Sequence, residues 1–88
     1  MYPFMTLDDN TEIVHSEMRD DGSVRVCCER PIPGDLKTAY CVIPGYKWYD
    51  VENFNEEELS KLTAVLKSVA HLILKYARNG GFLNASGF

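Results

Sequence analysis

The sequence has no long apolar run, and we expect no leader segment. Its most apolar stretch, Val69 to Leu74, is interrupted by His71 and is far shorter than the roughly 20 residues that span a bilayer. The N-terminus carries neither the basic segment nor the continuous apolar segment of a secretory signal. We therefore expect no membrane association and a cytoplasmic location.

Cysteine and histidine are also scarce, with three and two residues. Cys27 and Cys28 are adjacent, so a strand would point them to opposite faces, and Cys41, His15 and His71 stand alone. Zinc sites need paired ligands at short spacing. We predict structural thiols, with no disulfide, metal or cofactor, and find no motif typical of an enzyme.

Basic residues are outnumbered, nine against 13 acids, for a net charge of -4. This balance opposes attraction to phosphate, so nucleic acid is an unfavoured partner. The 88 residues are 45% hydrophobic, enough for a single core. We predict one α+β domain over residues 1–81 and a flexible tail over residues 82–88.

Turn signals divide the first half into β hairpins. Asp8-Asp9-Asn10 and Asp20-Asp21-Gly22 predict three-residue turns, and Pro33-Gly34 predicts a type II turn. The result is a four-stranded antiparallel meander. The expected partners across the second turn are Met18 with Val24, Ser16 with Val26 and Val14 with Cys28; across the third they are Val26 with Cys41, Val24 with Ile43 and Cys28 with Ala39.

These registers predict which side chains share a face of the sheet. The helix-covered face should hold Val14, Met18, Val24, Val26, Cys28, Ala39, Cys41 and Ile43. The other face should hold Arg25, Cys27, Glu29, Tyr40 and Val42, together with Met5, Leu7 and Ile13.

The second half predicts one long helix across the sheet. Asn55 is a good N-cap with Glu58 as its capping-box partner, and Asn79-Gly80-Gly81 is a stop signal. An apolar stripe runs along it at steps of three and four, formed by Leu59, Leu62, Leu66, Val69, Ile73 and Tyr76. Lys67, His71, Lys75 and Arg78 fall on the opposite face, which suits a solvated surface or, alternatively, a nucleic-acid contact.

Aromatic residues supply the candidates for partner binding. Tyr46, Trp48 and Tyr49 precede the helix without a helical period, and Tyr40 lies on the last predicted strand. Trp and Tyr dominate binding hot spots when exposed. The cluster fits a core lid, a binding surface or, in a further alternative, the wall of a small-ligand or enzymatic pocket.

The segment from Tyr46 to Gly81 resembles a group of small uncharacterised proteins from gut Firmicutes. The resemblance rests on Trp48, on Phe54 to Leu59, on Ala70 to Ile73 and on Ala77 to Gly81. It implies no activity and no catalytic residue.

Taken together, these features predict a non-catalytic protein-interaction module with an unknown protein partner, such as an accessory or inhibitor protein of a bacterial mobile element. One helix covers one sheet face, so apolar side chains remain on the other. A symmetric homodimer is the simplest way to bury such a patch. We expect a homodimer.

Overall fold

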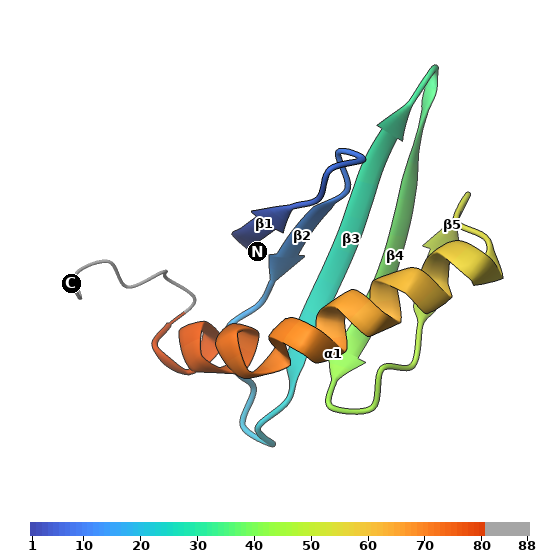
Figure 1. The fold of residues 1–88 in the computed structure, drawn as a ribbon. Coiled ribbons are helices and arrows are strands. Elements are labelled where there is room, and N and C mark those ends of the chain that lie inside the picture. The colour runs from blue at the N-terminus through green and yellow to red at the C-terminus, as the bar shows by residue number, and fades with distance from the viewer. Residues whose placement is uncertain (81–88) are drawn as a thin grey trace.

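A computed structural model describes residues 1–80, so the predicted tail over residues 82–88 lies outside the described residues. The chain forms one antiparallel sheet followed by one helix that crosses a face of it (Figure 1). The strands lie in chain order across the sheet. They are β1 (Tyr2–Thr6), β2 (Glu12–His15), β3 (Val24–Ile32), β4 (Asp35–Ile43) and β5 (Tyr49–Glu52), and the helix is α1 (Glu56–Arg78).

The predicted α+β meander is confirmed, but the sheet has five strands instead of four. The additional strand, β5, begins in the aromatic segment, where Tyr49 pairs with Tyr40. Asp50 has a left-handed backbone with φ of 51°, and the register shifts between Thr38 and Tyr40. This irregularity breaks the alternation of side chains that marks a strand in a sequence.

The predicted turns are confirmed. Asn10 and Gly22 have φ of 70° and 85°, and the flanking residues close each loop with hydrogen bonds from Leu7 N to Thr11 O and from Arg19 N to Ser23 O, both 2.8 Å. Gly34, with φ of 73°, turns β3 into β4. The β3–β4 register follows the prediction from Val24 opposite Ile43 through Cys28 opposite Ala39.

The predicted β2–β3 register is wrong by one residue. Val14 lies opposite Cys27 instead of Cys28, and His15 lies opposite Val26. An extra residue interrupts the ladder between the correctly predicted turn and β2. Met18 N leaves the sheet and donates to Ala77 O of the helix at 3.2 Å, while Ser16 Oγ accepts from Arg25 N at 3.0 Å. This bulge reverses the faces of β2.

The face assignments change accordingly. Ile13 and His15 are buried on the helix-covered face, and Val14 moves to the opposite face. Met5 and Leu7, predicted on the uncovered face, pack against the core instead. The assignments for β3 and β4 agree with the registers, because Val24, Val26, Cys28, Ala39, Cys41 and Ile43 are all buried in the core cluster.

The helix begins and ends as predicted. Asn55 caps Glu58 N, and the Glu58 side chain returns to Asn55 N, which completes the capping box. Leu62, Leu66 and Ile73 of the stripe are buried against the sheet, as is Ala77 beside it. No helix among the described residues is long and apolar enough to cross a membrane.

Candidate interaction surface

The face of the sheet opposite α1 is the candidate site, because no described segment packs over it (Figure 1). We call it the open face. Residues that lie opposite one another in neighbouring strands share a face, so the open face is a set of cross-strand rows. One row is Pro3, Val14, Cys27, Tyr40 and Tyr49; its neighbours are Thr6, Glu12, Glu29, Thr38 and Glu52 on one side and Arg25 with Val42 on the other.

The central row is apolar and aromatic. Tyr40 and Tyr49 stack with ring centroids 5.7 Å apart and planes 27° from parallel. The Arg25 guanidinium lies over the Tyr40 ring, 5.3 Å from its centroid. Cation–π and stacking contacts of this kind hold aromatic rings in a fixed orientation on the surface. Both rings remain half-buried, with a surface free to contact another molecule.

Cys27 lies next to Tyr40 in the central row and is only 2% exposed, although it belongs to the open face. Burial raises the pKa of the Cys27 thiol, and the Glu29 carboxylate adds to the rise. The pKa of Tyr40 is raised as well, mainly by the neighbouring Cys27. Neither group is activated as a nucleophile at neutral pH.

The neighbouring row is acidic. Glu12 and Glu29 lie directly opposite each other on β2 and β3, an arrangement in which like charges repel. They line a groove of about 310 Å³ that runs from the β1–β2 loop to the projecting end of the β3–β4 hairpin, and Pro31 and Leu36 supply its apolar part. The open face is therefore an apolar row with negative charge along one side.

Arg25 is the cation on the other side of the central row. Neither Arg25 nor Glu29 forms an ion pair with any residue from 1 to 80. Arg25 Nε is buried without a hydrogen-bond partner in the same part of the chain. A guanidinium that leaves a buried donor unused gains free energy when an acceptor is brought to it.

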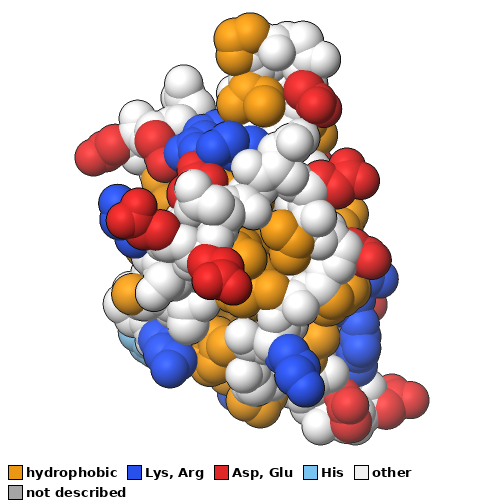
Figure 2. Space-filling view, turned by 90° about the vertical axis from the view of Figure 1, so that its right-hand side faces the viewer, with side chains coloured by type: hydrophobic (Ala, Val, Ile, Leu, Met, Phe, Trp, Pro, Cys, Tyr) orange, Lys and Arg blue, Asp and Glu red, His pale blue; other side chains and the backbone are white. Residues whose placement is uncertain are grey.

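The structure divides the four predicted aromatic residues between two places. Tyr40 and Tyr49 lie together on the open face. Tyr46 and Trp48 pack against the core cluster, and Trp48 Nε1 donates to Thr63 Oγ1 of the helix at 2.9 Å. Seen from the β5 side, hydrophobic side chains gather in the middle of the surface among acidic and basic ones (Figure 2).

The predicted basic strip of the helix is exposed along its length. Lys67, His71, Lys75 and Arg78 all lie in solvent, as expected for the face opposite the core. The Lys67 ammonium lies over the Tyr46 ring at 5.4 Å from its centroid. The same helix begins with three consecutive acids, Glu56 to Glu58, and apart from Lys61 its positive charge lies in its second half.

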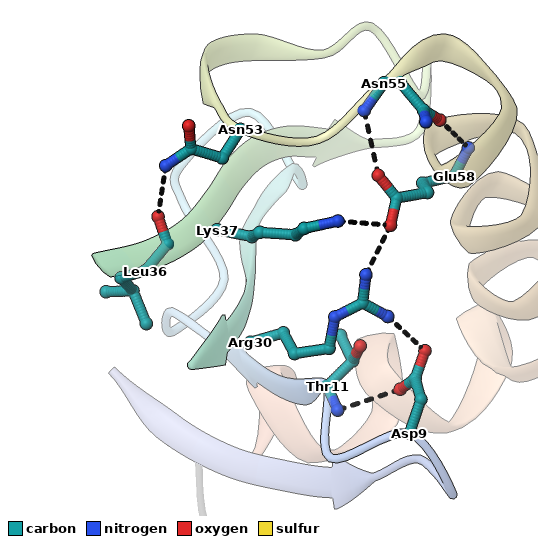
Figure 3. A network of polar contacts seen from close by, with 8 residues as sticks. All are labelled: Asp9, Thr11, Arg30, Leu36, Lys37, Asn53, Asn55 and Glu58. Atoms are coloured by element: carbon teal, nitrogen blue, oxygen red, sulfur yellow. Dashed lines mark hydrogen bonds and ion pairs between the residues drawn. The ribbon is translucent and has the colours of Figure 1, made fainter. Parts of the chain in front are cut away.

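A polar network that the sequence did not indicate ties the helix start to the sheet (Figure 3). Glu58 accepts from Arg30 and from Lys37 Nζ, the latter at 2.7 Å, and Arg30 also reaches Asp9 at 2.6 Å. The hydrogen bond from Lys37, together with that from Asn55 N, lowers the pKa of Glu58 to about 2. From the sequence, Glu58 was predicted only to cap the helix. Its ion pairs with Arg30 and Lys37 could not be predicted, because these residues lie beside Glu58 only once β3 and β4 have paired.

The residues that could carry nucleophilic or metal chemistry lie apart. His15 is buried, with Nδ1 2.8 Å from Ser16 O, and its ring contacts Tyr2 and Phe4. Cys28 and Cys41 are core residues, and burial raises the pKa of Cys41 to about 12. Within residues 1–80, no group of three His, Cys, Asp or Glu side chains could hold a metal ion.

Comparisons with known proteins add no relative: no family model, no curated protein and no solved structure matches the chain. The resemblance inferred from the segment Tyr46 to Gly81 therefore stays a prediction.

Proposed function

We propose that this chain is a non-catalytic protein-binding module and that it binds through the open face of its sheet. The observation that carries the proposal is the stack of Tyr40 and Tyr49 with Arg25 above it. Tyr and Arg are enriched in the residues that contribute most to binding between proteins, and here they are already held in place by one another.

The surroundings of this stack also support protein binding. An apolar row with charged residues along both sides matches the apolar centre and polar rim of protein interfaces. The groove beside it is partly open to solvent, unlike the enclosed pockets that bury most of a small ligand.

Affinity capture with matched variants tests the proposal. A tagged wild-type chain, the double variant Tyr40→Ser/Tyr49→Ser and the helix variant Lys67→Ala/Lys75→Ala are each incubated with a lysate of the source organism. Mass spectrometry and nucleic-acid staining then identify what is retained. We expect proteins that the wild type and the helix variant retain and the tyrosine variant loses.

The opposite pattern contradicts the proposal. Proteins retained equally by all three chains do not need the open face. Nucleic acid retained by the wild type and the tyrosine variant but lost from the helix variant assigns binding to the basic strip instead, and its affinity should then fall steeply with salt.

A further inference from the structure

The open face is self-complementary in charge, and we propose that its partner is a second copy of this chain, related by a two-fold axis that runs along the central row. This inference rests on the proposed function, because it names the partner of the same surface. Its basis is the position of Arg25 and Glu29 on β3.

Arg25 and Glu29 lie on the same strand at equal distances on either side of Cys27, and all three side chains point to the open face. The two charged side chains are half-buried and lack ion-pair partners within the described chain. In a face-to-face pair, the position of the symmetry axis decides which charges meet. Two axes in the plane of the sheet are available, one along β3 and one along the central row.

An axis along β3 would bring Arg25 onto its own copy and Glu29 onto its own copy, so like charges would meet at the centre of the interface. An axis along the central row reverses the strand direction of the copy. It places Arg25 over the second copy's Glu29 and Glu29 over the second copy's Arg25. Opposite charges then meet twice in one isologous interface, which selects this axis.

The central row would lie on the axis itself. Each of its residues faces the same residue of the second copy. Cys27 then lies between the two ion pairs, and the Tyr40 and Tyr49 rings of the two copies meet beside it, toward the β5 edge of the sheet. The carboxylate of Glu29 also faces the guanidinium of Arg25, whose Nε is buried without a hydrogen-bond partner within residues 1–80. Sheets stacked in this way pack about 10 Å apart with strand directions about 30° apart.

The size of the face sets the expected strength. Strands about 4.8 Å apart and side-chain rows about 6.8 Å apart give a projected area of about 400 Å² for each copy. Two copies then bury about 800 Å², less than the 1,200 to 2,000 Å² or so of most stable interfaces. The dimer should therefore dissociate in the micromolar range, in rapid exchange with monomer.

Sedimentation velocity over roughly 5 to 500 µM measures this equilibrium. The chains are the wild type, Arg25→Glu, Glu29→Arg, the charge swap Arg25→Glu/Glu29→Arg and the control Lys61→Glu, which reverses an exposed charge on the helix. Each single variant of the open face creates two repulsive pairs and should raise the dissociation constant by about 10-fold or more. The charge swap restores both pairs and should return to within about threefold of the wild type, as should the control.

A wild-type chain that sediments as monomer at every concentration overturns the inference, even if a variant fails to fold. So does a dimer that tolerates both single reversals or is not restored by the charge swap. The proposed function fails separately, in the capture experiment: a monomeric chain whose tyrosines still decide which proteins are retained binds a different partner with the same face.

Discussion

Leu66 is one of two helix residues, with Ile73, whose side chains are fully buried between helix and sheet. It lies on the buried stripe of α1 with none of its surface exposed. Leu66→Ala leaves a cavity and should lower the free energy of unfolding by about 2 to 5 kcal/mol. Lys67→Ala, one residue further on, removes only the contact with the Tyr46 ring and should cost about 0.5 kcal/mol. Urea unfolding measures both, and equal losses would contradict the assigned helix face.

Glu58 makes the stability of the protein depend on pH. Its pKa of about 2 lies below the usual 4.5, because Lys37, Asn55 and Arg30 hydrogen-bond to the carboxylate. A group whose pKa falls on folding stabilises the native state above its unfolded pKa and loses that contribution as the pH drops toward the folded value. Glu58 should therefore contribute fully at pH 7 and progressively less between about pH 5 and pH 2.

Glu58→Gln tests this contribution while keeping a side chain that suits the capping box. The partly exposed ion pairs suggest a loss of about 1 kcal/mol at pH 7. The difference from the wild type should shrink toward zero as the pH approaches 2, as followed by urea titrations at several pH values. Glu57→Gln, in the same helical turn but exposed, is the control. A difference that stays constant with pH would show that the charge of Glu58 does not matter.

At the scale of elements, the bulge between β2 and its turn decides the orientation of one strand. Ser16 Oγ replaces a backbone acceptor for Arg25 N at 3.0 Å. Ser16→Ala leaves that N–H without its partner and should cost about 1 to 2 kcal/mol in urea unfolding. Ser60→Ala, on the exposed side of the helix, should change the free energy of unfolding by less than about 0.5 kcal/mol. Equal effects would mean that water replaces the hydroxyl without loss.

The elements that the sequence predicted well are those whose signals are local. Asn10, Gly22 and Gly34 fix their turns through their backbone conformation, and Asn55 with Glu58 fixes the helix start. A two-residue turn also fixes the register on both sides of it, so the β3–β4 pairing followed directly.

The β2–β3 register could not be predicted in the same way, because its cause is distant in sequence. Met18 N does not pair within the sheet but donates to Ala77 O, and Ala77 lies near the end of the helix, far from Met18 in the sequence. The pattern of β2 also permits both registers, because Ile13 and Val14 are adjacent apolar residues between Glu12 and His15 and either can face the core. Alternation alone therefore favoured the wrong face.

The candidate site was predicted only in part for the same reason. Tyr40 and Tyr49 were chosen as binding residues by residue type alone. Their stacking requires β5, and the sequence did not predict this strand because the irregular backbone at Asp50 breaks its alternation. The partners of Glu58 were missed because Arg30 and Lys37 meet it only after β3 and β4 pair.

At the scale of the whole molecule, the sheet has two unlike faces. One is closed by α1 and contains Cys28 and Cys41 with none of their surface exposed. The other contains Cys27, which is covered only by neighbouring side chains of the open face and whose thiol, like the others, has a raised pKa because of burial. The reactivity of each thiol therefore measures a different motion: separation of α1 from the sheet for Cys28 and Cys41, and movement of side chains on the open face for Cys27.

Thiol labelling under native conditions separates these openings. Labelling of Cys28 and Cys41 requires the helix to leave the sheet, so their rates should fall to those set by global unfolding and should rise steeply with urea. Labelling of Cys27 requires only that the Tyr40 ring and Arg25 move aside, so it should be faster and nearly independent of low urea concentrations.

The labelling rates are measured by mass spectrometry on variants that each retain one cysteine. If all three rates agreed at every urea concentration, the open face would be as tightly closed as the core. Protection of Cys27 that increases with protein concentration would show that a second copy supplies the cover.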